Sequence, residues 1–163
     1  MHRTLMIVVV FGMVSTAACG SDPVDVAGDY SLSLTNHENA CMFPNWNENA
    51  TTTGVQMTLT QNGSSVSATA GGLVAPALDI YLGSHVFTGE LVGEHMDLHI
   101  AGTRAGSTGA CAYTINANVS ADIDGDVLTG TITYVAQHNN SADCGYLLTC
   151  ANEQAFNGTR PPR

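Results

Sequence analysis

A strict alternation of apolar and polar residues over 113–122 constrains the fold of this chain more than any other feature. The next run, residues 128–134, alternates in the same way, and shorter runs cover residues 30–35 and 55–60. Successive side chains of a β-strand point to opposite faces, so each run predicts a strand with one buried and one solvated face. No segment keeps a sustained helical period, and we therefore expect an all-β domain with little helix.

Turn signals separate these runs. Asn62-Gly63 and Asp124-Gly125 are the strongest hairpin dipeptides, and Val92-Gly93-Glu94 is similar. We expect an antiparallel up-and-down meander of about 8–10 strands that closes into a small barrel over residues 28–163, with a β-sandwich as the alternative. Closure is favoured because the expected dry faces include small residues that fit the crowded interior of a narrow barrel. These are Gly89, Ala117 and Gly130.

Two further features mark the ends of this domain. Gly28-Asp29-Tyr30 opens the first expected strand, and Arg160 follows the last one. With these residues the chain resembles the lipocalin and avidin group of barrels, in which a Gly-x-Trp element opens the first strand and an arginine near the C-terminus often closes one barrel end. Tyr30 stands where that group has tryptophan. The resemblance implies an interior that binds a small ligand, which is an inference by fold analogy.

The N-terminus indicates export. An apolar run over residues 5–11 is too short to span a bilayer, and small residues follow it, which is typical of a signal peptide over residues 1–18. Ala17-Ala18-Cys19 resembles the lipobox of bacterial lipoproteins, although Thr16 replaces the usual aliphatic residue, so an ordinary signal peptide is the alternative. The resemblance implies that Cys19 carries lipid, that residues 19–27 form a linker, and that the protein sits in the bacterial cell envelope. Gly20 favours the outer membrane, on its periplasmic or its outer surface.

The charge balance excludes one class of partner. The chain has 14 Asp and Glu residues against 4 Lys and Arg, giving a net charge of −10. Such a surface repels phosphate backbones, so we expect no nucleic-acid binding. It would attract a basic protein partner or divalent cations, but an acidic surface also simply keeps an exported protein soluble.

Four cysteines remain once Cys19 is set aside. An even number in an oxidising compartment predicts two disulfides. They are Cys41, Cys111, Cys144 and Cys150. Sequence alone leaves three pairings open. We favour Cys144 with Cys150, because Gly145 could help the short segment bend back, which leaves Cys41 to pair with Cys111.

Two expected loops are longer than the hairpins. The first, residues 36–54, contains the only tryptophan, Trp46. Long loops in compact domains are often functional, so Trp46 could stack on a ligand at the barrel mouth, but we favour its packing as a plug of that mouth. The second, residues 101–110, contains Arg104 and is rich in Gly, Ser and Thr, which indicates mobility more than chemistry.

Two acidic patterns resemble metal sites only superficially. His95, Asp97 and His99 would share one face of a strand, but the residues between them are apolar, so we expect this face to be solvated and the histidines to bind no metal. Residues 122–126 have the acidic density of a calcium loop without its later ligands, and turn chemistry explains them. The sequence has no nucleophile elbow, H-E-x-x-H, P-loop or G-x-G-x-x-G motif. We therefore expect a non-enzymatic protein with no cofactor and no metal.

Two functions remain. The first is a lipid-anchored barrel that binds a small apolar or amphipathic ligand in its interior or at its mouth. Its candidate ligand-binding residues are Tyr30, Trp46, Tyr81, Phe87, Tyr113 and Tyr134. The alternative is an inhibitor-type module with a filled barrel that grips another protein. An open, partly polar cavity would favour the first, and an interior packed solid by aromatic residues would favour the second.

Overall fold

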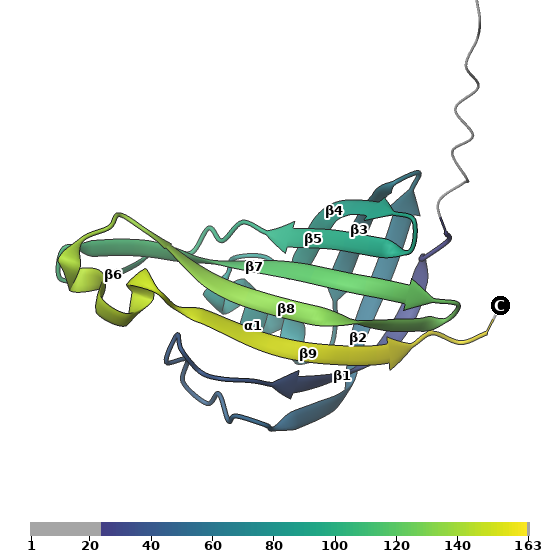
Figure 1. The fold of residues 1–163 in the computed structure, drawn as a ribbon, viewed down its shortest axis with the longest axis horizontal. Coiled ribbons are helices and arrows are strands. Elements are labelled where there is room, and N and C mark those ends of the chain that lie inside the picture. Colours follow the sequence, from purple (N-terminus) through teal and green to yellow (C-terminus); the bar gives the residue numbers. More distant parts are fainter. Residues whose placement is uncertain (1–23, 163) are drawn as a thin grey trace, which may run out of the picture.

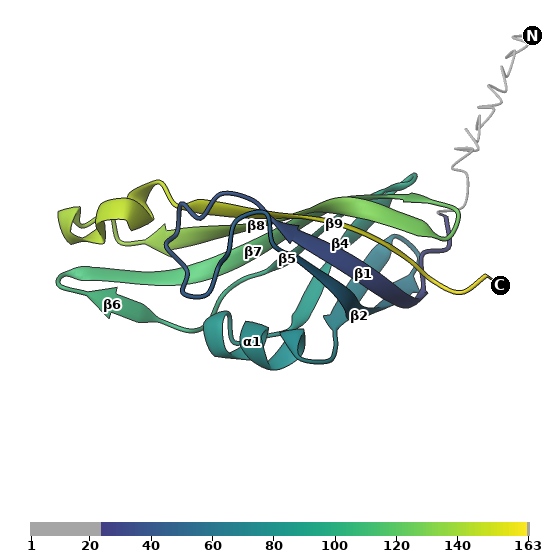
Figure 2. The same ribbon diagram turned by 90° about the horizontal axis from the view of Figure 1, so that it is seen from below.

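The computed structural model describes residues 24–162 (Figures 1 and 2). The predicted signal peptide and Cys19 lie outside the described residues. The strands are β1 (Gly28–Asn36), β2 (Thr51–Asn62), β3 (Ser65–Ala70), β4 (Val86–Val92), β5 (His95–Ile100), β6 (Gly106–Thr108), β7 (Cys111–Asp124), β8 (Val127–His138) and β9 (Ala151–Thr159). Helix α1 (Val74–Tyr81) lies between β3 and β4, and the 3-10 segment η1 (Ala142–Leu148) lies between β8 and β9.

The strands form a closed antiparallel barrel. Each strand of the series β1 to β5 pairs with the next, β7, β8 and β9 continue the meander, and β9 pairs back with β1. The pairing of β5 with β7 closes the ring, so that eight strands make the barrel and β6 is an extra strand on β7. The predicted all-β meander and its closure are confirmed. A two-sheet sandwich does not describe this topology.

Short hairpins and long connections segregate to opposite ends of the barrel. The three predicted hairpins form the turns β2–β3, β4–β5 and β7–β8, where Gly63, Gly93 and Gly125 have positive φ, as such turns require. Because strand direction alternates, all three lie at the end where β1 starts and β9 stops, here called the closed end. The connections 37–50, 71–85, 101–110 and 139–150 therefore gather at the other end, the open end.

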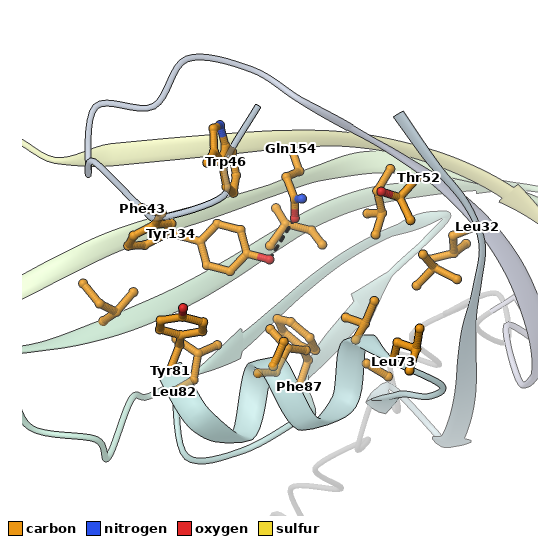
Figure 3. Close-up of a pocket in the computed structure, with 18 of the residues that line it drawn as sticks. Leu32, Phe43, Trp46, Thr52, Leu73, Tyr81, Leu82, Phe87, Tyr134 and Gln154 are labelled. Atoms are coloured by element: carbon orange, nitrogen blue, oxygen red, sulfur yellow. Dashed lines mark hydrogen bonds between the residues drawn. The ribbon is translucent and has the colours of Figure 1, made fainter. Parts of the chain in front are cut away.

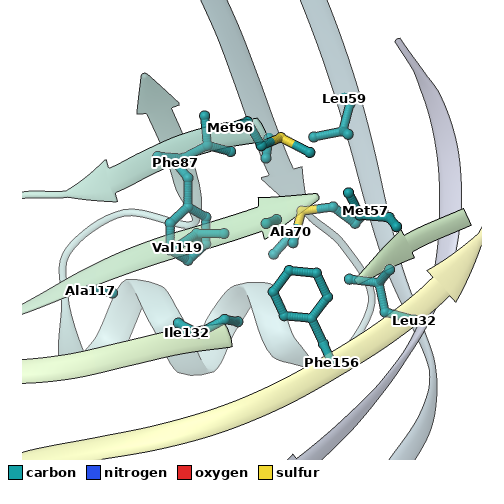
Figure 4. Packing of buried hydrophobic residues seen from close by; sticks show 14 of the residues in the cluster. Leu32, Met57, Leu59, Ala70, Phe87, Met96, Ala117, Val119, Ile132 and Phe156 are labelled. Atoms are coloured by element: carbon teal, nitrogen blue, oxygen red, sulfur yellow. The ribbon is translucent and has the colours of Figure 1, made fainter. Parts of the chain in front are cut away.

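The barrel interior is filled near the closed end. Inward positions alternate with outward ones, as the burial of β5 illustrates, where Met96, Leu98 and Ile100 are buried and Asp97 and His99 are exposed. Figure 4 shows apolar side chains from opposite walls meeting across the interior. They leave a gap of only about 20 Å³, lined entirely by apolar residues. This half of the barrel is a packed core.

Arg160 lies at the closed end of the barrel, next to this packed core. Its Nε donates to the Asp126 carboxylate at 2.8 Å, and its side chain is 7% exposed. The guanidinium also donates to the backbone carbonyls of Ala27, Asp25 and Gly125, at 2.8, 2.9 and 3.2 Å. The guanidinium carbon lies 5.6 Å from the centre of the Tyr30 ring, in a cation–π arrangement.

The stretch predicted as a linker ends inside the fold. Val26 is fully buried, and its amide donates to the Gln61 side chain at 2.7 Å. Its carbonyl accepts a hydrogen bond from the Tyr30 hydroxyl at 3.0 Å. Residues 24–27 thus pack across the closed end, beneath Arg160.

Two disulfides form, as predicted, but their pairing is Cys41–Cys150 and Cys111–Cys144, so the favoured pairing was wrong. The reason lies in which strands are neighbours. Cys150 precedes β9, whose neighbour β1 leads into residues 37–50 and Cys41. Cys144 follows β8, whose neighbour β7 begins at Cys111. Cα–Cα distances of 4.5 and 4.9 Å suit both bridges.

Beyond the open end, the start of β7 and the end of β8 extend as a two-stranded ribbon that β6 and η1 flank (Figures 1 and 2). The disulfide cysteines and Leu147 form a small second core there. Strand β6 lies within residues 101–110, and the Gly102 amide donates to the Asn116 side chain at 2.9 Å. The segment that composition alone marked as mobile therefore contains regular backbone pairing.

Candidate functional site

The open half of the barrel holds a cavity of about 290 Å³ (Figure 3). Strand residues form its walls, α1 borders one side, and the segment 37–50 covers another. The walls are mostly aliphatic and aromatic, with Thr52 and Gln154 as polar members. A cavity of about 150 Å³ is large enough to bind benzene, so this one has room for a molecule of roughly two fused rings.

The segment 37–50, here called the roof loop, is fixed to β9 at three points. The Cys41–Cys150 disulfide joins it to the residue before β9. Asn152 is fully buried, and its side chain accepts from the Cys41 amide at 2.7 Å and donates to the Asn39 side chain at 2.8 Å. The His37 amide donates to the Glu153 carbonyl at 2.9 Å. These contacts hold the loop over the cavity.

The roof loop contributes an aromatic wall. Phe43 and Trp46 lie 5.9 Å apart in an edge-to-face arrangement, and each lies 6.0 Å from Tyr134 on β8, also edge to face. Tyr81 from α1 stacks on Phe43 at 6.4 Å. Pairs of this geometry are favourable. Trp46 thus belongs to a roof with a cavity beside it, and its Nε1 donates outward to the His37 carbonyl at 2.9 Å.

Helix α1 is anchored at its C-terminal end. Gly83 has a φ of +86° and its amide donates back to the Leu78 carbonyl at 3.2 Å, which ends the helix. The Asp79 side chain pairs with His85 at 2.8 Å, and the Asp79 carbonyl accepts from Arg104 at 3.2 Å. Leu78 packs into the core while Leu73, just before the helix, is 94% exposed at the cavity rim. The helix is therefore held against the mouth of the cavity.

A chain of hydrogen bonds supplies the polar part of the cavity. The Tyr134 hydroxyl donates to Gln154 Oε1 at 2.9 Å, the contact drawn in Figure 3. Gln154 Nε2 donates to Asn36 Oδ1 at 2.7 Å, and Asn36 Nδ2 donates to the Asn47 carbonyl at 3.0 Å. Burial raises the pKa of the Tyr134 hydroxyl well above its usual value, so the group stays protonated at physiological pH.

The structure brings four of the six predicted ligand-binding residues into this cavity: Trp46, Tyr81, Phe87 and Tyr134. It does not bring the other two there. Tyr30 lies beneath Arg160 at the closed end, and Tyr113 packs beside the second core near the disulfides.

Several cavity residues were not among the predicted ones. On β9, residues 152, 154 and 156 share the inward face; Gln154 lines the cavity, and Asn152 holds the roof loop through Cys41 and Asn39. Polar residues at inward positions of a strand were the sequence signal that could have identified them. Val74 and Leu78 line the cavity from α1. The sequence carried no signal for them, because a helix of only eight residues is too short to show a clear helical period.

The predicted solvent-facing histidines lie on the outer face of β5. His95 is paired with Asp122 on β7 at 2.7 Å and lies 3.4 Å from Asp97. The hydrogen bond to Asp122 is the main cause that raises the pKa of His95. Within residues 24–162, no group of three or more His, Cys, Asp or Glu side chains could hold a metal ion. Residues 122–126 form the end of β7 and its hairpin turn, as turn chemistry predicted.

Comparisons with protein-family models, with curated proteins and with solved structures found no match for this chain. In the part of the chain that the structure describes, neither α1 nor η1 has the length and apolar character needed to cross a bilayer.

Proposed function

We propose that this protein is a non-enzymatic binding protein whose barrel holds a small apolar or amphipathic molecule. The observation that carries the proposal is the contrast between the two halves of the barrel. The closed half is packed, with a gap of about 20 Å³, while the open half keeps a cavity of about 290 Å³ that reaches the surface beside the exposed Leu73. Ligand sites are concave and mostly apolar with a few polar groups, as this cavity is.

The closed end supports a lipocalin-like or avidin-like interpretation of the barrel. Tyr30 stands in the Gly-x-Trp position of that group, and Arg160 lies over its ring, 5.6 Å from the ring centre. An aromatic residue of the first strand under a C-terminal arginine is the feature on which the resemblance was based. The contact between Arg160 and the Tyr30 ring supports a barrel that is closed at this end and that a ligand enters from the other end.

We further propose that lipid on Cys19 anchors the protein in the bacterial outer membrane, on either surface. Cys19 precedes the first described residue, Val24, by only five positions, and residues 24–27 pack across the closed end. An extended chain spans at most about 3.5 Å per residue, so an anchor at Cys19 would keep the closed end within roughly 20 Å of the membrane. The cavity mouth lies at the other end of the barrel and would be accessible from the aqueous side.

Partly filling the cavity should weaken ligand binding. Val74 lines the cavity from α1, so in Val74→Phe the larger ring would occupy space that a ligand needs. We expect naphthalene to bind the wild-type protein in equilibrium dialysis and to change the emission of Trp46, which is the only tryptophan. A steric overlap of about 1–3 kcal/mol predicts that Val74→Phe binds naphthalene about 5- to 150-fold more weakly than the wild type.

Ile80→Phe is the matched control. Ile80 lies on the same helix but is 68% exposed and does not line the cavity. This variant adds an aromatic ring to the same helix and should bind naphthalene as the wild type does. Equal binding by Val74→Phe and Ile80→Phe would mean that naphthalene binds elsewhere, and no binding by the wild type would contradict the proposed function.

Anchoring is tested separately. Cells that express the full chain are labelled with a palmitate analogue, and the wild type should incorporate label and fractionate with membranes. Cys19→Ala should lose both properties, because the proposed acceptor sulfur is gone. Ser21→Ala, two residues away, is the control and should keep both. Label that persists in Cys19→Ala would contradict the proposed anchor.

A further inference from the structure

The hydrogen-bond chain in the cavity has a fixed direction. The Asn47 carbonyl can only accept, so it orients the Asn36 amide with its nitrogen toward Asn47 and its oxygen toward Gln154. The Asn36 oxygen in turn requires the Gln154 nitrogen, which leaves Gln154 Oε1 for Tyr134. The Tyr134 hydroxyl therefore uses its single proton on Gln154. Its oxygen keeps an acceptor site, and Figure 3 shows this hydroxyl among the residues that line the cavity.

The cavity offers nothing that would neutralise a charged ligand. Among the residues that the structure describes, those lining the cavity include no Asp, Glu, Lys, Arg or His. A charged group that is transferred from water into such a site loses its hydration without gaining an ionic partner. The net charge of −10 disfavours an anion further.

A cation fits no better. The rings of Phe43, Trp46 and Tyr134 pack edge to face at 5.9–6.0 Å, so they contact one another and do not stand apart as the walls of an aromatic cage. The nearest carboxylate on α1, Asp79, is paired with His85. The remaining wall is aliphatic, and it includes Leu34, Val55 and Ile132.

We infer that the natural ligand is an uncharged molecule of about two fused rings that carries one hydrogen-bond donor, a hydroxyl or an N–H, which it donates to the Tyr134 oxygen. This inference rests on the proposed function and specifies the ligand of the same cavity. It excludes fatty-acid carboxylates and quaternary amines as ligands, and it distinguishes hydroxyl-bearing molecules from ethers of the same shape.

A set of probes with one common body tests each part of the inference by equilibrium dialysis at neutral pH. The set comprises naphthalene, 2-naphthol, 2-methoxynaphthalene, 2-naphthoate and protonated 2-(aminomethyl)naphthalene. We expect 2-naphthol to bind about fivefold more tightly than naphthalene, which is the value of one net neutral hydrogen bond. The methoxy compound should gain nothing, because it has no proton to donate. Both ions should bind at least about tenfold more weakly than naphthalene.

Two variants locate the hydrogen bond. Tyr134→Phe alone would leave Gln154 Oε1, in the same cavity, without its donor and free to accept from a ligand, so the test variant is Tyr134→Phe/Gln154→Leu. In this double variant 2-naphthol should lose its advantage while naphthalene binding stays the same. Tyr146→Phe is the matched control, because it also removes a tyrosine hydroxyl, but Tyr146 lies on η1, is 48% exposed and does not line the cavity. It should keep the fivefold preference.

The outcomes separate the two levels of the proposal. Binding of either ion as tightly as 2-naphthol, equal binding of the ether and the alcohol, or a preference that survives in Tyr134→Phe/Gln154→Leu would overturn the inference and leave the proposed function standing. Failure of every probe, naphthalene included, would overturn both.

Discussion

Replacing Arg160 by alanine should lower the free energy of unfolding by about 2–3 kcal/mol, because a buried guanidinium that makes several charge-assisted hydrogen bonds is removed. The guanidinium satisfies the Asp126 carboxylate and three backbone carbonyls, and its side chain is 7% exposed. In the variant these acceptors lose their partner at the closed end, and the Tyr30 ring loses the cation above it. Urea denaturation followed by circular dichroism measures the change.

Arg104→Ala is the matched control for charge and side-chain length. Arg104 is exposed and donates one hydrogen bond, to the Asp79 carbonyl at 3.2 Å. Its loss should cost less than about 1 kcal/mol. Arg160→Lys keeps the charge but cannot make the forked set of contacts, so it should fall between the two. A loss in Arg160→Ala no larger than that in Arg104→Ala would contradict the proposed role of the closed end.

The barrel could be predicted because the sequence features that specify it, strand alternation and turn dipeptides, involve residues close together in the chain. Alternation over residues 113–122 and 128–134 places one face of β7 and β8 inside, and glycine turns such as Asp124-Gly125 join neighbours in the sequence. An up-and-down meander needs nothing more than such neighbours until its last pairing. The two short helical segments carry no comparable pattern, and their packing against the barrel determines them more than their sequence does.

The disulfides and the cavity depend on information that is not local. Cys144 and Cys150 are close in the sequence, but each forms a disulfide with a cysteine at or near the strand that neighbours its own. Only the order of strands around the barrel determines which strands are neighbours. Trp46 and Tyr134 were predicted as members of one site, because aromatic residues are typical of ligand sites. Tyr30 has the same chemistry and lies at the other end, so residue type without position along the barrel cannot separate a ligand wall from a structural contact.

The two ends of the barrel contribute differently to the stability of the fold. The closed end combines short turns, a packed interior and the contacts of Arg160, and it defines the stable part of the fold. The open end leaves about 290 Å³ unfilled, so contacts that a packed core would make are missing there. The roof loop must then be held by other means, and its disulfide to Cys150 is the strongest of them.

Removing this disulfide in the double variant Cys41→Ser/Cys150→Ser should cost about 4.7 kcal/mol of unfolding free energy, the chain-entropy value for a loop of about 100 residues. The bridged cysteines are 109 positions apart. The change also frees the loop that carries Phe43 and Trp46, so naphthalene binding should weaken in proportion to the fraction of molecules whose roof loop has left the cavity. Urea denaturation and equilibrium dialysis measure the two effects.

The double variant Cys111→Ser/Cys144→Ser separates these effects. Its cysteines are 33 positions apart, so the same model predicts a smaller loss, about 3.7 kcal/mol. This bridge lies in the extension beyond the open end and does not line the cavity. The folded variant should therefore bind naphthalene with wild-type affinity. If both double variants lost binding equally, the roof loop would not be the element that the Cys41–Cys150 bridge positions, and if neither lost it, the aromatic wall would form without the bridge.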